Sequence, residues 1–170
     1  MVGFDWGGSD RLRGLANEVL KACKAHGLMV ATAESCTGGM VVAVLTDIPG
    51  SSSVVERGFV TYSNEAKTEM LGVPIALIDT HGAVSEPVAR AMAEGALSNS
   101  RADLAVSVTG IAGPGGGTAS KPEGLVHFSC SRRGGTAAHA RIEFSALGRD
   151  QVRAASVQQA LTMLLEAADL

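Results

Sequence analysis

Three small polar segments carry the residues of this sequence that could perform chemistry. They read Glu34-Ser-Cys-Thr-Gly-Gly39, Tyr62-Ser-Asn-Glu-Ala-Lys67 and Thr109-Gly-Ile-Ala-Gly-Pro-Gly-Gly-Gly-Thr118, and each directly follows a run that is typical of a strand. The first two supply a hydroxyl, a thiol, a phenol and an amine, and the third supplies a flexible row of backbone N–H groups. Because open α/β sheets bind ligands at the carboxyl ends of their strands, we expect a catalytic pocket there.

The first segment offers a nucleophile. Ser35 lies between a buried strand and a helix that opens at Gly38 and Gly39, where a ligand can approach the backbone closely. The unpaired N–H groups of this opening, with Cys36 and Thr37, could hold an oxyanion. The alternative is that Ser35 or Thr37 merely caps the helix. Cys36 is a rival nucleophile because helix N-termini activate thiolates, although a free cysteine is more often a small buried hydrophobe.

The second segment offers a base. Lys67 stands one turn into a helix that Ser63 caps, where the helix dipole opposes a positive charge and lowers a lysine pKa. Such a lysine can act as a general base toward a serine hydroxyl. The alternative is a solvated surface lysine paired with Glu65 or Glu69. Tyr62 could donate to the oxyanion or relay a proton, or it could lie half-buried at the end of a strand.

The third segment matches neither of the common nucleotide-binding loops. It lacks G-x-x-x-x-G-K-[ST], and it lacks the third glycine and the helix of a dinucleotide fingerprint. A glycine-rich loop after a strand can still form a nest for a phosphate or carboxylate, and the alternative is a flexible surface loop. We expect substrate contacts at Thr109, Gly110, Ala112, Gly113, Gly115 and Gly116, and Thr118, Ser120 and Lys121 favour phosphate.

Apolar periodicity and turn residues predict the elements that position these segments. The expected helices are one between Ser9-Asp10 and Gly27, Thr37 to Leu45, Ser63 to Leu71, one capped by Ser85, and Arg149 to Ala167. The expected strands are Leu28 to Ala33, Val54 to Tyr62, Leu104 to Val108, and a hairpin of Leu125 to Ser131 with Ala137 to Phe144. This order predicts a three-layer α/β/α sandwich with a mixed, mostly parallel sheet and a C-terminal hairpin and helix.

The bulk properties narrow the class of protein. The chain of 170 residues suits a single domain over 1–170, with 1–8 as a loose tail. A net charge of −3 and 4% aromatic residues argue against a nucleic-acid partner. The cysteines form no C-x-x-C pair and the histidines no cluster, so we expect neither disulfides nor a metal. Neither a signal peptide nor a membrane span is evident, which predicts a cytoplasmic protein.

Four strings of the sequence occur in a familiar order: A-T-A-E-S-C-T-G-G, T-Y-S-N-E-A-K, G-A-V-S-E and S-V-T-G-I-A-G-P-G-G-G-T. From about Leu12 to the final helix, the chain resembles the CinA C-terminal domain family of competence-damage-inducible proteins, which includes the nicotinamide mononucleotide deamidases. The resemblance implies the stand-alone form of that domain, with Ser35 as the nucleophile, Tyr62 and Lys67 assisting it, and no metal or organic cofactor. The segment Val54-Val55-Glu56-Arg57-Gly58 departs from the family pattern of an aromatic residue and a Gly-Gly pair, which bears on a pocket wall or a subunit contact.

The favoured function is therefore hydrolysis of the carboxamide of nicotinamide mononucleotide, giving nicotinate mononucleotide and ammonia. In this hypothesis Lys67 takes the proton of Ser35, backbone N–H groups from Cys36 to Gly39 hold the oxyanion, and Lys67 or Tyr62 protonates the departing ammonia. A non-catalytic nucleotide-binding or interaction module, linked to competence and recombination, would not need Ser35 and Lys67 together. A hydrolase of another small amide is a third possibility. We expect a homodimer from the Ala- and Leu-rich terminal helix.

Overall fold

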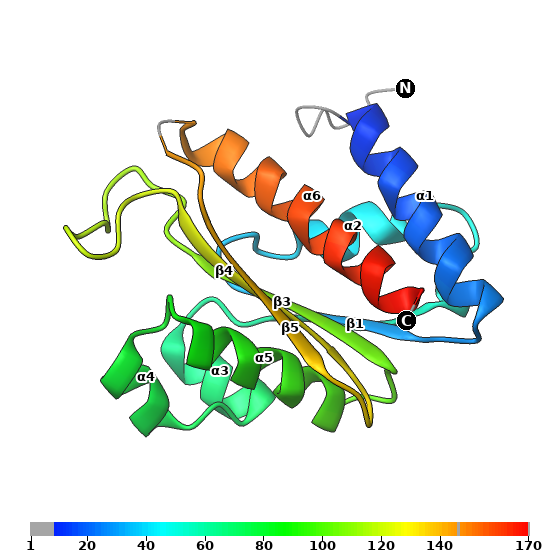
Figure 1. The fold of residues 1–170 in the computed structure, drawn as a ribbon, viewed down its shortest axis with the longest axis horizontal. Coiled ribbons are helices and arrows are strands. Elements are labelled where there is room, and N and C mark those ends of the chain that lie inside the picture. Colours follow the sequence, from blue (N-terminus) through cyan, green and yellow to red (C-terminus); the bar gives the residue numbers. More distant parts are fainter. Residues whose placement is uncertain (1–8, 146, 170) are drawn as a thin grey trace.

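The computed structural model describes residues 9–145 and 147–169. Its five strands form one sheet in the order β2-β1-β3-β4-β5 (Figure 1), with β1 paired in parallel to β2 and β3, and β4 antiparallel to β3 and β5. The strands span Val30–Glu34 (β1), Val55–Val60 (β2), Leu104–Gly110 (β3), Leu125–Arg132 (β4) and Ala137–Glu143 (β5). The predicted mixed sheet and late hairpin are confirmed.

Helices cover both faces of the sheet and confirm the three-layer sandwich (Figure 1). One face carries α1 (Ser9–Ala25), α2 (Met40–Thr46) and α6 (Arg149–Ala168), and the other carries α3 (Asn64–Leu71), α4 (Ile75–His81) and α5 (Glu86–Ser98). Among the described residues, no helix has the length and apolar character needed to cross a membrane. The loose tail expected over residues 1–8, and the cap expected from the Ser9 side chain, lie outside what the structure describes.

The structure differs from the sequence prediction in the start of one helix and in two short elements that were not predicted, and β1 and β2 differ from the predicted strands by one or two residues at their ends. The helix expected from Thr37 begins at Met40, because Gly39 takes a left-handed conformation (φ 98°) that a helix cannot include. The seven-residue α4 and a short 3₁₀ helix, Ser51–Ser53, were not predicted, since neither is long enough to show apolar periodicity. The α3 prediction is confirmed: the Ser63 hydroxyl accepts the Ala66 N–H (3.0 Å).

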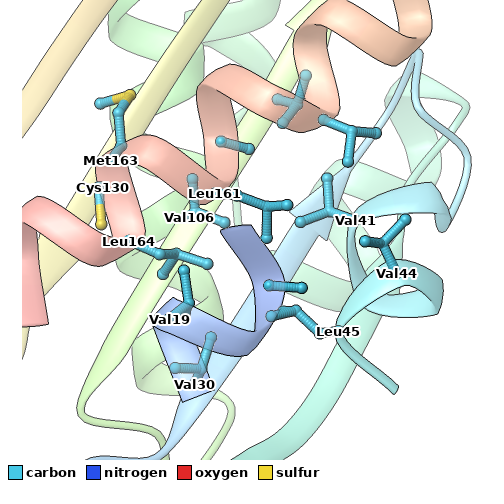
Figure 2. Close-up of a cluster of buried hydrophobic side chains, with 14 of the residues drawn as sticks. Val19, Val30, Val41, Val44, Leu45, Val106, Cys130, Leu161, Met163 and Leu164 are labelled. Atoms are coloured by element: carbon cyan, nitrogen blue, oxygen red, sulfur yellow. The ribbon is translucent and has the colours of Figure 1, made fainter. Parts of the chain in front are cut away.

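The core has two parts, one on each face of the sheet. The larger part, seen in Figure 2, joins α1, α2 and α6 through residues such as Val19, Val41 and Leu161. The smaller part packs α3 and α5 against β1 and includes Ala33 and Met92. Because both faces are covered, β1 and the first six residues of β3 are buried along their whole length, as expected of strands in a parallel sheet.

Parallel pairing brings the three polar segments to one edge of the sheet. Glu34, the last residue of β1, is in register with Val60 on β2 and Val108 on β3. The segments that follow β1, β2 and β3 therefore emerge side by side. The fold places them together even though they are far apart in the sequence.

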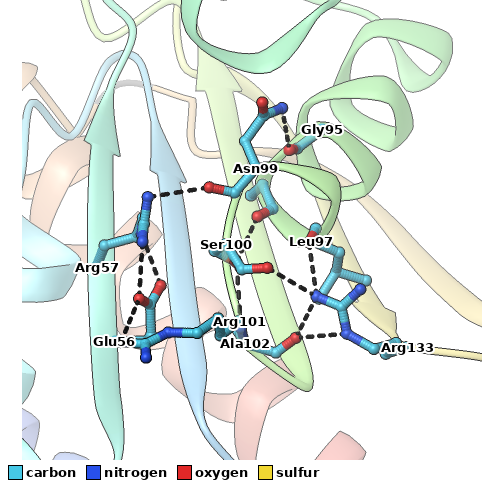
Figure 3. Close-up of polar contacts among 10 residues, drawn as sticks. Glu56, Arg57, Gly95, Leu97, Asn99, Ser100, Arg101, Ala102 and Arg133 are labelled. Carbon is cyan, nitrogen blue, oxygen red and sulfur yellow. Dashed lines mark hydrogen bonds and ion pairs between the residues drawn. The ribbon is translucent and has the colours of Figure 1, made fainter.

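The opposite edge of the sheet is tied together by arginines (Figure 3). Arg133 donates to the carbonyl oxygens of Leu97 (2.6 Å), Ser100 (3.1 Å) and Ala102 (2.8 Å), which closes the C-terminal end of α5. Arg57 pairs with Glu56 and donates to the Asn99 carbonyl (3.0 Å). The segment from Val54 to Gly58, which departs from the family pattern, thus contacts the end of α5 and does not line the pocket described below.

Candidate active site

A cavity of about 240 Å³ lies at the carboxyl ends of β1 and β3. All three polar segments contribute to it, together with the loop before α5 and the first residue of α6. Its lining residues are Ser35, Cys36, Tyr62, Asn64, Lys67, Ala83, Val84, Thr109, Gly110, Ala112 and Arg149. A larger hollow of about 490 Å³ between α1 and α6 is lined by residues such as Leu12 and Leu147, and its described lining contains no comparable pairing of a nucleophile with a base.

Ser35 and Lys67 meet in this cavity. The Lys67 Nζ atom lies 3.1 Å from the Ser35 Oγ atom, and it lies 2.9 Å from the Thr61 carbonyl oxygen. Only 1% of Lys67 and 9% of Ser35 is exposed to solvent. The expected contact between hydroxyl and amine is confirmed, and the alternative of a solvated lysine on the surface is wrong.

Burial shifts Lys67 toward the neutral amine. Burial lowers the pKa of Lys67 and outweighs the opposing influence of Cys36 and Glu65. Within 9–145 and 147–169, no carboxylate forms an ion pair with its Nζ atom. A neutral lysine can donate to the Thr61 carbonyl and keep a lone pair for the Ser35 proton, which is the requirement for a general base.

Glu34 fixes the backbone that carries Ser35. Its fully buried carboxylate accepts the N–H groups of Gly39 (3.1 Å), Val41 (3.0 Å) and Val42 (3.0 Å). Charge-assisted bonds to the first turn of a helix satisfy a buried carboxylate well. Sequence reasoning missed Glu34, and the available signal was an acidic residue at a strand end five residues before Gly39.

Two N–H groups of the turn from Ser35 to Gly39 have no acceptor among the described residues: that of Cys36, which lines the cavity, and that of the buried Thr37 beside it. Gly38 donates to the Ser35 carbonyl (3.0 Å) and Gly39 to Glu34, so neither serves the oxyanion. The N–H groups of Cys36 and Thr37 have no acceptor within the part of the chain that the structure describes. Of the oxyanion donors expected from Cys36 to Gly39, the structure thus leaves Cys36 and Thr37.

Cys36 lines the cavity as a protonated thiol. Burial raises the pKa of Cys36 to about 12, and the nearby charge of Glu34 acts in the same direction. The expected activation at a helix N-terminus does not overcome burial. The raised pKa of the thiol and the contact of Lys67 with Ser35 therefore favour Ser35 over Cys36 as the nucleophile.

Arg149 brings a positive charge to the cavity that sequence reasoning did not foresee. Its Nη1 atom donates to the Gly113 carbonyl (2.7 Å), and its Nη2 atom lies 3.4 Å from the Tyr62 hydroxyl. Tyr62 is 62% exposed, so its hydroxyl stands at the mouth of the cavity and bonds to Arg149. The half-buried alternative for Tyr62 is wrong, and a basic residue opening the last helix was the only signal for Arg149.

The glycine-rich loop contributes less than expected. Thr109, Gly110 and Ala112 line the cavity, as predicted. The other expected substrate contacts do not line it: Thr37, Gly38, Gly39, Gly113, Gly115 and Gly116. Within the loop, the Gly115 N–H donates to the carboxylate of Glu123 (2.9 Å).

No cluster suitable for a metal ion occurs in the described ranges: nowhere do three or more His, Cys, Asp or Glu side chains gather in that way.

Fold and site together define a class of protein: a small α/β/α domain with a buried serine–lysine contact at the carboxyl ends of parallel strands. Residues 12–168 match the family model described as the CinA C-terminal domain. The chain belongs to this family.

Relatives and solved structures agree with this assignment. The chain is 53% identical over 150 residues to the nicotinamide-nucleotide amidohydrolase PncC of Escherichia coli (strain K12), covering 88% of this chain and 90% of that protein. It is 54% identical over 142 residues to a CinA-like protein of Akkermansia muciniphila, covering 82% of this chain but only 34% of that protein. The crystal structure of competence/damage inducible protein CihA from Agrobacterium tumefaciens superposes with a TM-score of 0.91 at 51% identity, over 94% of this chain and 96% of that one.

Proposed function

We propose that this protein is an amidohydrolase that converts nicotinamide mononucleotide to nicotinate mononucleotide and ammonia. The observation that carries the proposal is the 3.1 Å contact between the Lys67 Nζ and Ser35 Oγ atoms inside the cavity. The likeness to PncC, which extends over 88% of the chain, supports the choice of substrate.

The chemistry follows from the position of each group. Neutral Lys67 accepts the proton of Ser35 as the Oγ atom bonds to the carboxamide carbon, and the carbonyl oxygen becomes an oxyanion. The free N–H groups of Cys36 and Thr37 stabilise that oxyanion. The C–N bond then breaks as Lys67 returns the proton to the departing nitrogen, which leaves as ammonia. Water, deprotonated by Lys67, hydrolyses the acyl-enzyme and regenerates Ser35. Only protein groups and water take part.

The cavity suits a pyridine carboxamide with a charged extension. The carboxamide end reaches Ser35, and the ribose phosphate extends to the mouth, where the Arg149 guanidinium can pair with the phosphate in place of its bond to Tyr62. Tyr62 then lies beside the ribose phosphate at the mouth of the cavity, and Lys67 alone transfers protons during the reaction. This placement moves the expected phosphate site from the glycine loop to Arg149, since the Gly115 N–H of the loop already bonds to the Glu123 carboxylate.

We also propose that the enzyme acts on this small molecule without a nucleic-acid or membrane partner, as a cytoplasmic homodimer. The net charge of −3 supports the first part. Light scattering on the purified chain tests the second part: a mass of twice 17.3 kDa is expected, and a monomer would contradict it.

The decisive assay measures ammonia and nicotinate mononucleotide after the purified protein meets nicotinamide mononucleotide. We expect turnover by the wild type and its loss in Ser35→Ala. Ser131→Ala is the matched control, because Ser131 is also buried but its hydroxyl has no partner within the described residues and lies on β4. Binding of the nucleotide without ammonia release would instead support a binding module, and release only from other amides would reassign the substrate.

A further inference from the structure

We propose that Arg153 is a positioning residue that orients the N–H groups of Cys36 and Thr37 toward the reacting carbonyl oxygen. The inference deepens the proposed amidohydrolase function and rests on it. Arg153 does not line the cavity, so it is not placed to touch the substrate. It acts through the backbone that follows the nucleophile.

The contacts of Arg153 are to two consecutive carbonyl groups. Its Nε atom donates to the Cys36 oxygen (3.1 Å), and its Nη2 atom donates to the Thr37 oxygen (3.3 Å). The planar guanidinium holds both bonds in one fixed geometry, which a flexible ammonium cannot do. Arg149 lies four residues earlier on the same side of α6 and lines the cavity. One helix therefore provides both Arg149 at the mouth of the cavity and Arg153 behind the turn that follows Ser35.

Because the peptide bond is planar, a bond that holds a carbonyl oxygen also fixes the direction of the N–H group in the same peptide unit. The Cys36 carbonyl and the Thr37 N–H belong to one trans peptide unit and point in opposite directions. When Arg153 holds the Cys36 oxygen, the Thr37 N–H must point away from α6. The preceding peptide is fixed in the same manner, because the Ser35 oxygen accepts the Gly38 N–H (3.0 Å) and so directs the Cys36 N–H.

Little else restrains the central peptide of this turn. Glu34 anchors the turn only from Gly39 onward, and the Met40 N–H bonds to the Thr37 oxygen (3.1 Å). Gly38 and Gly39 both adopt positive φ values, 59° and 98°, and glycine changes its backbone conformation readily. Without Arg153, the Cys36–Thr37 peptide has no hydrogen bond to its oxygen in the described ranges, so its orientation is less firmly held.

The test compares three variants with the wild type. Arg153→Ala removes both bonds, and Arg153→Lys retains the charge but carries its donors on one nitrogen, without the planar fork. Arg132→Ala is the matched control, because Arg132 also bonds a backbone carbonyl of α6, that of Ala167 (3.0 Å), at the far end of the helix. Removing an oxyanion donor costs about 10²–10³ in kcat, so a misdirected donor predicts a fall of about 10- to 100-fold in Arg153→Ala with KM changed by less than about 3-fold.

Two further readouts separate positioning from mere structural support. Guanidinium at millimolar concentration is expected to restore part of the turnover of Arg153→Ala, with Arg153→Lys lying between the alanine variant and the wild type. The melting temperature is expected to fall no further in Arg153→Ala than in Arg132→Ala. A loss of kcat that merely follows the loss of thermal stability in both variants would overturn the proposal.

The rate at which a fluorophosphonate labels Ser35 gives the closing measurement, because it needs no knowledge of the substrate. We expect slower labelling in Arg153→Ala than in wild type and Arg132→Ala. Equal labelling of all three, with an active wild type, would overturn the role of Arg153 and leave the proposed function intact. A wild type that neither labels at Ser35 nor releases ammonia would overturn the proposed function, and the role of Arg153 with it.

Discussion

Gly95 offers the sharpest test of how the fold supports the site. It lies on α5 where that helix crosses the end of α3, and a Cβ atom built on it would fall 2.0 Å from the Leu71 carbonyl oxygen and 2.9 Å from the Leu71 Cβ atom. No flexible side chain can relieve this contact, since the nearest atom belongs to the backbone. A Cβ atom and a carbonyl oxygen need to be about 3 Å apart, and here they would be 2.0 Å apart. Gly95→Ala must therefore separate α3 from α5 by roughly 1 Å.

The expected cost is a balance of two effects. Overpacking against backbone costs up to about 3 kcal/mol, whereas replacing glycine by alanine inside a helix recovers about 1 kcal/mol. The net loss of about 2 kcal/mol predicts a fall in Tm of about 4–8 °C for a chain of this size. Lys67 lies one turn before Leu71 on the same helix, so the same movement displaces the Lys67 Nζ atom and lowers kcat by about 10- to 100-fold.

Thermal unfolding and ammonia release on the same samples measure both effects. Gly14→Ala is the matched control: it is the same substitution on α1, at an exposed glycine where an added Cβ atom would meet nothing within 4 Å. It is expected to raise the Tm by about 2–4 °C through helix propensity alone, with kcat unchanged. A Gly95→Ala protein as stable and as active as Gly14→Ala would show that the spacing of α3 and α5 does not support the site.

Three further predictions concern the titrating groups. Lys67→Met is expected to lower kcat by about 10²–10⁴-fold, the usual contribution of a general base, and turnover within about tenfold of wild type would count against the proposed base. The kcat/KM of the wild type is expected to rise with pH as Lys67 loses its proton. Cys36→Ala is expected to retain turnover, and its inactivation would make Cys36 the nucleophile. Burial and the neighbouring His139 lower the pKa of His127 to about 4 in the folded protein. In the unfolded chain the pKa of His127 is near 6.5, so the unfolded state binds the proton first as the pH falls. Stability is then lost between pH 6.5 and 4, by at most about 3 kcal/mol, and denaturant titrations of His127→Phe are expected to show a flatter pH dependence over this range.

The sequence predicted the parts of the fold that depend on local patterns. Ser63 and Gly72 bounded α3 correctly because capping is a matter of a few neighbouring residues. The continuous apolar runs of β1 and β3 were recognised because helices cover both faces of the sheet. The short α4 escaped prediction since seven residues give too little periodicity to distinguish a helix.

The site was predicted where its residues follow strands and missed where contacts span the chain. Ser35 and Lys67 could be proposed because parallel strands bring their ends together, but the burial of Lys67 depends on packing that no local pattern records. Arg149 and Arg153 reach the site from positions 87 and 117 residues away from Tyr62 and Cys36. Such contacts have no periodic signature.

The glycine loop shows what a local pattern cannot record. A row of glycines after a strand is suited to an anion, and the sequence pointed to phosphate. The structure shows that Glu123, eight residues beyond Gly115, also brings a carboxylate to the Gly115 N–H. Composition alone could not distinguish an internal anion from a bound one.

The proposed mechanism depends above all on attack of the Ser35 hydroxyl on the carboxamide carbon. Acid quenching of the enzyme during turnover of nicotinamide mononucleotide, followed by peptide mass mapping, examines this step itself. We expect an acyl group of nicotinate mononucleotide on the peptide that contains Ser35, present in Cys36→Ala and absent in Ser35→Ala. An acyl group carried by Cys36, or unimpaired turnover in Ser35→Ala, would contradict it.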